Sequence, residues 1–384
     1  MKIALVHDWL TGMRGGEKCL EAFCARFPEA PLFTLLHRLG KLSPVIERMD
    51  IRTSFLQKLP GASKHYRHLL PLMPRAIESL ELPGDIDLVL SFSHAVAKSI
   101  HVPDGVPHAC YCFTPMRYAW HLRDQYLGQD DASVWPRPWD WARNQVLDRI
   151  RDWDRATAER VTQFVAISRT IADRIRECYG RESAVVYPPV DTEYFSPSAA
   201  PREDFYLCFS ALVPYKRVEL AIEACRILGR RLVVIGAGPE RARLQKLAGP
   251  HVRFTGWQSD ESIRDHLRRC RALLFAAHED FGIAPVEAQA CGTPVIAFGQ
   301  GGATETLLAA DEEHIGTSVL FPEQTAASLA EAIRWFEAHP RQFSPTLARR
   351  NAERFERSRF EQELLNLVEQ VAADRHATAP RRAA

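Results

Sequence analysis

Short apolar runs alternate with helical patterns twice along this chain of 384 residues. Runs of this length, bounded by turn residues, are typical of buried parallel strands. In the first half they occupy residues 3–7, 88–92, 109–113 and 163–168, and in the second half residues 205–210, 231–236, 252–256, 271–277 and 295–297. The pattern predicts an α/β protein with two doubly wound domains that face each other across a cleft.

A proline-rich segment separates the two series of strands. It reads Tyr187-Pro188-Pro189-Val190-Asp191, and each proline biases the preceding residue towards extended geometry. We therefore expect an N-terminal domain at residues 1–188 and a C-terminal domain at residues 189–360. Just before the linker, Ser168 is a candidate N-cap for a helix at residues 169–179.

Composition and charge argue against a nucleic-acid-binding protein, a signal segment and a membrane-spanning segment. A net charge of +1 does not favour nucleic-acid binding, which needs a concentrated basic face. The nine cysteines form no paired CxxC sets, and such a scattered odd count indicates reduced thiols and a cytoplasmic location. The apolar start of the chain is broken at His7-Asp8, so we interpret it as a first strand and not as a signal segment. No apolar run is long enough to span a membrane.

Residues 279–287 place two carboxylates, Glu279 and Glu287, eight positions apart across a glycine turn that opens a helix at residues 284–290. A strand, a short loop and a helix N-terminus together attract anionic ligands. Carboxylates beside an anion would repel it unless they bind hydroxyls, so the expected ligand carries both phosphate and sugar. Two isolated glutamates would more often be ordinary surface acids.

The surrounding residues resemble the donor-site signature of the family 4 retaining glycosyltransferases, which have the GT-B fold of two Rossmann-like domains. The stretch contains an acid, Phe-Gly, a proline and Glu-Ala, followed by Gly-Thr-Pro-Val-Ile-Ala at residues 292–297. The resemblance implies that Glu279 contacts the donor sugar and that Glu287 holds the nucleotide ribose. It also implies that the backbone faces the donor at Phe281, Gly282, Ile283 and Ala284.

Residues 210–218 resemble the phosphate loop of the same family, whose lysine neutralises the donor diphosphate. This implies that role for Lys216. Many members carry an arginine five residues earlier, where this chain has Ala211, and we expect Arg217 to supply the missing charge. The alternative is a solvated Lys-Arg pair at a helix start. Residues 185–195 resemble the family's interdomain segment, with Pro188-Pro189 in place of Asn-Gly.

The sequence Gly236-Ala237-Gly238-Pro239 matches part of a dinucleotide fingerprint. The third glycine is absent, because Arg241 stands three positions after Gly238, which disfavours a nicotinamide dehydrogenase. In family 4 such a segment shapes the nucleotide side of the C-terminal domain, which implies donor binding at Gly236. Trp257 falls where the family approaches the base, although plain packing is an equal alternative.

In the first half, Gly15 and Gly16 resemble the family's glycine turn, whose backbone approaches the donor phosphate. A simple helix-start turn is the alternative. Residues 93–98 and 111–120 resemble a subgroup that includes bacterial O-antigen mannosyltransferases. Where those relatives often carry a histidine near the donor sugar, this chain has Phe113. We expect His94 and Arg117 to provide the polar contacts on the acceptor side, although a lone histidine is more often structural.

The resemblance predicts a retaining glycosyltransferase that moves mannose from GDP-mannose to a lipid-linked or oligosaccharide acceptor in surface-polysaccharide biosynthesis. Lys216 would stabilise the leaving diphosphate, Glu279 would orient the sugar, and His94 would contact the reacting centre. We predict that the reaction needs no metal and no cofactor. The alternatives are a UDP-sugar donor and an inactive relative that binds a nucleotide sugar or a partner.

Two segments predict peripheral contact with the cytoplasmic face of the inner membrane. Residues 58–75 and 135–143 mix basic and apolar side chains, although ordinary packing explains such segments more often. The amphipathic helix expected at residues 355–373 would cross back to the N-terminal domain, as in relatives. Within the segment 361–384, the tail at residues 375–384 has no core and is expected to be disordered.

Overall fold

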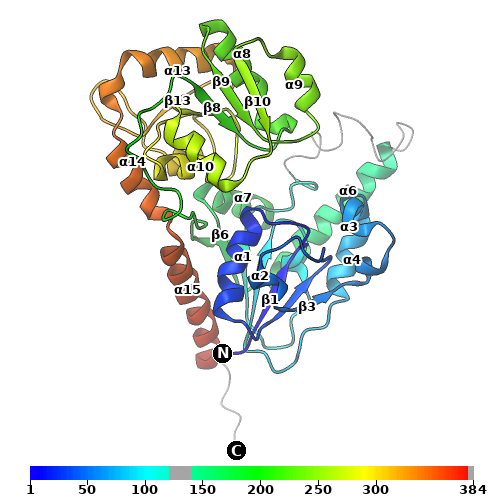
Figure 1. Ribbon diagram of the computed structural model, residues 1–384. Coiled ribbons are helices and arrows are strands. Elements are labelled where there is room, and N and C mark those ends of the chain that lie inside the picture. Colours follow the sequence, from blue (N-terminus) through cyan, green and yellow to red (C-terminus); the bar gives the residue numbers. More distant parts are fainter. Residues whose placement is uncertain (121–139, 379–384) are drawn as a thin grey trace, which may run out of the picture. The chain divides into compact units, whose positions relative to one another are not determined.

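The structure is a computed structural model that describes residues 1–120 and 140–378 (Figure 1). The chain forms two compact units. Unit 1 comprises residues 1–188 together with the chain from Phe360 onward, and unit 2 comprises Pro189–Arg359. Each unit is built on one sheet whose strand pairs are all parallel. The predicted α/β class with two doubly wound units is confirmed.

Unit 1 contains a seven-stranded sheet in the order β3-β2-β1-β4-β5-β6-β7. The strand order reverses between β1 and β4. The chain continues from β1 into the half of the sheet that holds β2 and β3, and from β4 into the half that holds β5, β6 and β7. The strands are β1 Ile3–His7, β2 Pro31–Thr34, β3 Asp50–Thr53, β4 Leu88–Ser93, β5 His108–Cys112, β6 Gln163–Ala166 and β7 Ser183–Val185. The helices are α1 Gly15–Arg26, α2 Pro44–Glu47, α3 Ala62–His65, α4 Met73–Glu78, α6 Asp140–Ala156 and α7 Arg169–Tyr179.

Local signals explain two helix starts in unit 1. The Ser168 side chain accepts a hydrogen bond from the Ile171 N–H at 3.2 Å, which confirms the predicted N-cap of α7. Helix α1 begins at Gly15, so both predicted glycines lie in its first turn and not in a loop before it. The Glu17 carboxylate accepts the Arg14 N–H at 3.1 Å and closes this helix end.

Unit 2 contains a six-stranded sheet in the order β10-β9-β8-β11-β12-β13, and its order reverses between β8 and β11. The strands are β8 Tyr206–Phe209, β9 Leu232–Ile235, β10 Val252–Gly256, β11 Leu273–Phe275, β12 Val295–Phe298 and β13 Ser318–Phe321. The helices are α8 Val218–Leu228, α9 Arg241–Leu247, α10 Asp260–Arg269, α11 Ile283–Ala290, α12 Ala303–Thr306, α13 Ala326–Ala338 and α14 Pro345–Ala352.

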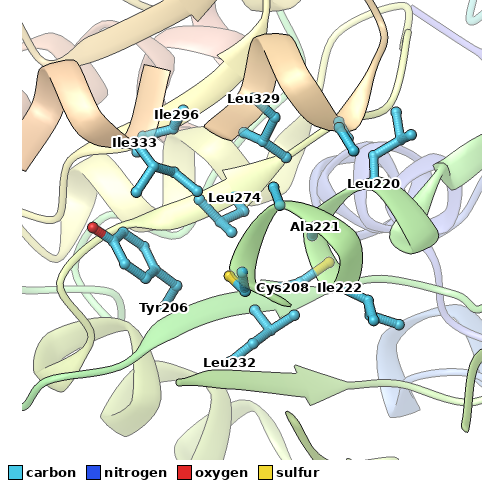
Figure 2. Close-up of a cluster of buried hydrophobic side chains, with 14 of the residues drawn as sticks. Tyr206, Cys208, Leu220, Ala221, Ile222, Leu232, Leu274, Ile296, Leu329 and Ile333 are labelled. Carbon is cyan, nitrogen blue, oxygen red and sulfur yellow. The ribbon is translucent and has the colours of Figure 1, made fainter. Parts of the chain in front are cut away.

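The main core of unit 2 lies between the sheet and the helices α8 and α13. Alternate strand residues such as Leu232, Leu274 and Ile296 point into it, because side chains alternate between the two faces of a strand. Leu220 of α8 and Leu329 of α13 close the core from the helix side, as Figure 2 shows. This packing fixes the strand ends from which the candidate site is built.

The last helix, α15 (Arg357–Thr378), begins in unit 2 and joins unit 1 from Phe360. The Phe360 ring contacts Phe23 and Tyr111 of unit 1, with ring centroids 6.0 and 5.4 Å apart. The helical backbone of α15 continues to Thr378, so the expectation of disorder from residue 375 is wrong for residues 375–378. The N–H groups of these four residues continue the hydrogen-bond ladder of the helix. The expectation for residues 379–384 lies outside the described residues.

The linker and the cysteines complete the fold. Between β7 and β8 the prolines at 188 and 189 carry no regular structure, and the Val190 N–H donates to the Phe355 carbonyl at 2.8 Å.

All nine cysteines are buried free thiols. Within the described part of the chain, no helix combines the length and apolar character needed to cross a membrane.

Candidate functional site

The switch point of the unit 2 sheet brings Lys216 and Glu279 together. Lys216 ends a short helical turn (η6, Pro214–Lys216) that follows β8, and Glu279 follows β11. The two side chains form an ion pair, and both are largely but not fully buried, with 16% and 22% of their side-chain surface exposed. The Lys216 ammonium also lies 5.3 Å from the centre of the Tyr215 ring. A cation and a carboxylate therefore meet where open parallel sheets bind ligands.

Helix α11 begins at Ile283, four residues after this carboxylate. Gly282 is its N-cap and has a φ of 84°, a left-handed conformation that glycine adopts without strain. Ile283 and Ala284 are half-buried in the first turn, whose N–H groups have no partner within the helix. The Phe281 ring is buried against Phe355 at 5.4 Å, so its side chain anchors the loop. The predicted backbone positions thus lie at the positive end of a helix.

Glu287 lies one turn further along α11 and is 7% exposed. The helix around it is rigidly held. The Gln289 amide donates to the Thr306 carbonyl at 2.9 Å, and Asn351 donates to the Gln289 side-chain oxygen at 2.7 Å. A buried carboxylate on a helix anchored in this way keeps a fixed position, which suits a group that selects a ligand.

Gly236 has a structural reason to be glycine. Its φ is 145°, and a Cβ at this position would lie 1.9 Å from the Ser210 carbonyl oxygen. A Cβ on Gly238 would lie 2.2 Å from the Leu212 carbonyl oxygen. The loop after β9 therefore packs directly against the loop after β8 that leads to Lys216. Gly236 shapes the phosphate-loop region through this packing, and direct contact with a donor stays a prediction.

Two other predicted donor residues have distinct environments. The Trp257 side chain is 78% exposed, which excludes the alternative that it is a core residue. Arg217 has a φ of 52°, and its Nε donates to the Glu219 carboxylate at 2.7 Å. The charge of Arg217, expected to replace an arginine that the family carries at the position of Ala211, is thus paired with Glu219 in the first turn of α8.

Gly301 and Gly302, which were not among the predicted site residues, support the loop that carries Glu279. The Gly302 N–H donates to the Glu279 carbonyl at 2.7 Å. A Cβ on Gly302 would lie 2.3 Å from the Phe281 Cα, and a Cβ on Gly301 would lie 2.4 Å from the Glu279 carbonyl oxygen. The available signal was the sequence Gly-Gln-Gly-Gly directly after an apolar run.

The switch point of the unit 1 sheet carries Asp8 after β1 and His94 after β4. Asp8 is completely buried, and its oxygens accept the N–H groups of four consecutive residues, His94 to Ala97, at 2.6–3.0 Å. The His94 Nδ1 lies 3.0 Å from the Asp8 Oδ2, and 27% of the His94 side chain is exposed. Burial opposes ionisation of Asp8, but the His94 imidazole and its hydrogen bonds bring the Asp8 pKa down to about 2. His94 was among the residues predicted from the sequence, whereas Asp8 was not.

His7, at the end of β1, is buried beside this pair. Its Nδ1 lies 3.1 Å from the Trp9 carbonyl oxygen, while its Nε2 has no hydrogen-bond partner among the described residues. Burial, reinforced by the nearby His94, lowers the His7 pKa to about 4. His7 is therefore neutral at physiological pH, and the geometry places its proton on Nδ1.

Phe113 follows β5 and lies next to the same cluster. Its ring centroid is 6.2 Å from that of His94, and its ring atoms would lie 3.3 Å from a Cβ on Gly16. A side chain on Gly16 would thus press on Phe113 and approach the His7 Nε2 at 3.5 Å. Arg117 is half-buried four residues after Phe113. Of the predicted unit 1 residues, the structure brings Gly16 and His94 close to the Phe113 ring.

Comparisons with known proteins agree with this geometry. A family model described as "Glycosyltransferase Family 4" matches residues 29–194, and one described as "Glycosyl transferases group 1" matches residues 190–354. Together the two models span residues 29–354, which leaves β1 and α1 of unit 1 outside the matched range.

The chain belongs to the family 4 glycosyltransferases.

Two curated relatives are mannosyltransferases. The chain is 30% identical over 221 residues to a GDP-mannose-dependent alpha-(1-6)-phosphatidylinositol monomannoside mannosyltransferase of Mycobacterium tuberculosis, covering 49% of this chain and 54% of the relative. It is 34% identical over 175 residues to the enzyme of the same description from Mycolicibacterium smegmatis, covering 37% of this chain and 45% of the relative. The matches thus span only about half the length of these relatives.

A solved structure shows the same fold over nearly the whole chain. The HepE protein of Anabaena, in complex with UDP and glucose, has a TM-score of 0.68 and 18% sequence identity. The match covers 96% of this chain and 99% of that protein. At this identity the likeness concerns the fold alone, and it confirms that this family 4 glycosyltransferase has two Rossmann-like GT-B units.

Proposed function

We propose that this family 4 glycosyltransferase is a retaining mannosyltransferase that uses GDP-mannose. The observation that carries the proposal is the Lys216–Glu279 pair at the switch point of unit 2, directly before the N-terminus of α11. A cation, a carboxylate and free helix N–H groups match a ligand that combines diphosphate and sugar hydroxyls. The mannosyltransferase relatives support mannose and guanine as the sugar and base.

In the proposed reaction, the bond between the sugar and the diphosphate breaks as the acceptor hydroxyl forms a bond to the same face of the sugar. The departing phosphate oxygen takes the proton of that hydroxyl. Lys216 and the first-turn amides of α11 stabilise the negative charge on the leaving group. Glu279 orients the sugar and stabilises the positive charge that develops on it. The step uses no metal, and the acceptor is a lipid-linked or oligosaccharide glycan.

The experiment that tests this function is incubation of the protein with a panel of GDP- and UDP-sugars, with lipid-linked glycan acceptors present. Loss of donor and the anomeric configuration of the product are followed by ¹H NMR, with EDTA in a parallel sample. Turnover of GDP-mannose with the α-anomer retained and no effect of EDTA is the expected result. Consumption of a UDP-sugar instead would replace the donor assignment, and inversion of the anomer would contradict the retaining mechanism.

A second candidate is an inactive relative that binds a nucleotide sugar without turning it over. Phe113 favours it, because an apolar ring lies against Gly16 where the resemblance implies a histidine. Calorimetric titration with GDP-mannose separates the two functions. Binding without turnover under every acceptor condition would support the inactive relative, whereas turnover excludes it.

We also propose that residues 58–75 contact an anionic membrane surface at the cytoplasmic face. This segment exposes Leu59 and Leu72, at 38% and 43%. Its exposed cations are Lys58, Lys64, Arg67 and Arg75, and residues 51–77 contain no acidic side chain. Such a surface binds lipid through apolar insertion and attraction to anionic headgroups. The second segment predicted to contact the membrane, residues 135–143, lies largely outside the described residues.

Flotation with phosphatidylcholine vesicles, with and without about 30% phosphatidylglycerol as a physiological anionic fraction, tests this surface. We expect binding only to the anionic vesicles, and loss of binding in the Lys58→Glu, Lys64→Glu, Arg75→Glu triple variant. Lys246→Glu on the exposed side of α9 is the matched control in unit 2. Equal binding by the triple variant and the control would refute the surface.

A further inference from the structure

Asp8 and His94 are joined in a way that the reaction described above does not require. They are 86 residues apart in the chain, and they meet because β1 and β4 are adjacent parallel strands that end at the same edge of the sheet. That edge is the switch point of unit 1, where open α/β sheets bind ligands. The pair is therefore built into the position at which a unit of this topology contacts its substrate.

The Asp8 carboxylate fixes the backbone that carries His94. Its Oδ2 accepts the N–H groups of His94 and Ala95 at 2.6 and 3.0 Å, and its Oδ1 accepts those of Val96 and Ala97 at 2.6 and 2.7 Å. Four donors that converge on two oxygens need a group with acceptor capacity only. An ionised carboxylate meets this need, whereas an amide would place its own N–H groups against two of the donors.

The same carboxylate also fixes the imidazole ring. The His94 Nδ1 lies 3.0 Å from the Asp8 Oδ2, so Nδ1–H donates to the buried carboxylate. Aromatic rings confine the imidazole on several sides: Trp9 meets it edge-on at 4.5 Å, His7 lies at 5.8 Å and Phe113 at 6.2 Å. The ring thus has one nitrogen bound inside the protein, while 27% of its side-chain surface is exposed.

We propose that Asp8 is a positioning residue that holds the His94 imidazole as the Nδ1–H tautomer, so that Nε2 accepts a hydrogen bond from a carbohydrate hydroxyl. A neutral imidazole has one donor and one acceptor nitrogen, and the bond made by the donor decides which nitrogen is the acceptor. Sugar hydroxyls are hydrogen-bond donors, so a preorganised acceptor nitrogen at the switch point orients them. The kinetic part of this inference rests on the proposed function, because it requires a sugar-transfer reaction.

The first test measures the tautomer in the wild-type protein. Protein labelled with ¹⁵N-histidine is studied by long-range ¹H–¹⁵N correlation, and the His94 signals are assigned by their loss in His94→Gln. The expected result is an Nδ1–H tautomer for His94 at neutral pH, changing to a mixture in Asp8→Asn. An Nε2–H tautomer in the wild type would overturn the proposal without any variant of Asp8, even if that variant failed to fold.

The second test is a double-mutant cycle on the turnover of GDP-mannose. Asp8→Asn and His94→Ala should each lower kcat by about 10- to 100-fold with little change in the donor KM. If Asp8 acts through His94, the double variant is no slower than the slower single variant. Ser93→Ala is the control for a merely loosened turn, because Ser93 Oγ accepts the Lys98 N–H at 3.2 Å in the same turn.

The outcomes separate this inference from the proposed function. Multiplicative losses in the double variant, or a Ser93→Ala loss as large as that of Asp8→Asn, would show that Asp8 acts only by holding the turn. If the wild-type protein turned over no nucleotide sugar, the proposed function would fail. The tautomer measurement would still decide whether Asp8 positions His94.

Discussion

Lys216 and Glu279 contact each other across the switch point of the unit 2 sheet, 63 residues apart in the chain. The ammonium assigned to the diphosphate and the carboxylate assigned to the sugar therefore reach one point. A nucleotide sugar has its diphosphate directly next to its first sugar carbon. The two neighbouring groups of the ligand thus correspond to two neighbouring side chains of the protein.

Removal of the ammonium should slow the chemical step more than it weakens binding. For Lys216→Ala we expect kcat to fall by about 10²–10³, because the charge on the leaving group grows most in the transition state. Steady-state turnover of GDP-mannose measures this change. Lys246→Ala, an exposed lysine of α9, is the matched control and should keep wild-type kcat. A Lys216→Ala enzyme with unchanged kcat would contradict the role of Lys216.

Substitution of the buried acid of α11 should act mainly on donor affinity. Glu287→Gln keeps the shape of the side chain but loses its charge, and hydrogen bonds to charged groups contribute about 1.5–3 kcal/mol. We therefore expect donor affinity to fall by roughly tenfold to 150-fold, measured by calorimetric titration. Glu331→Gln on the exposed side of α13 serves as the comparison and should bind normally. Equal affinity in both variants would argue against the ribose contact.

A methyl group at Gly236 should destabilise unit 2. The Cβ would overlap the Ser210 carbonyl and the residue would keep a φ of 145°, so Gly236→Ala should cost at least about 2 kcal/mol. Gly229 has a φ of 63° and no neighbouring atom within 4 Å of the place where its Cβ would lie, so Gly229→Ala should cost only about 1–2 kcal/mol. Urea unfolding followed by hydrogen exchange of the unit 2 peptides measures the difference. Equal losses of stability in the two variants would mean that the loop at Gly236 shifts away from the Ser210 carbonyl at no cost.

The stability of unit 1 should fall as the pH drops from about 6.5 towards 4. Burial lowers the pKa of His7 to about 4 and that of His108 to about 3, so between these values and 6.5 the unfolded chain binds protons that the native state does not. Each such histidine removes up to about 1.4 kcal/mol of stability per pH unit. The raised pKa of the buried Glu17 acts in the opposite direction and reduces the effect.

Amide hydrogen exchange of the β4 and β5 peptides at pH 6.5 and 5.0, corrected for the intrinsic rates, measures this loss. His108→Gln should reduce the pH dependence, because it removes one of the two buried histidines. His314→Gln is the control, since the His314 side chain is 72% exposed. A pH dependence that is the same in His108→Gln and in the wild type would show that buried histidine is not its cause.

Truncation of Phe360 should open unit 1 and not unit 2. Its ring is 2% exposed and packs on Phe23 and Tyr111, so Phe360→Ala should cost about 3–5 kcal/mol. Faster hydrogen exchange in the α1 and β5 peptides reports this change. Phe355→Ala should instead loosen the loop around Phe281, which its ring contacts in unit 2. Identical exchange patterns in the two variants would contradict the assignment of Phe360 to unit 1.

The sequence by itself determined the fold class, the positions of most strands and the acidic loop before α11. These features depend on local causes: apolar runs form buried strands, Ser168 caps its helix, and glycine alone suits the φ of 84° at Gly282. Lys216, Glu279 and Glu287 could be found because their motifs are contiguous. The strands β2, β3, β7 and β13 were not among the predicted runs, because each is a run of three or four residues that includes a proline, a serine or a charged residue.

Only the tertiary structure decided which distant groups meet. Asp8 gives no local signal, and its importance arises from a parallel pairing that sets the end of β1 beside the end of β4. Likewise, glycine is required at position 302 because a side chain there would clash with Phe281, which lies earlier in the chain. The pairing of Arg217 with Glu219 depends on the direction of the Arg217 side chain. Parallel sheets gather the carboxyl ends of strands at one edge, so contacts there depend on strand order, which no local pattern of residues encodes.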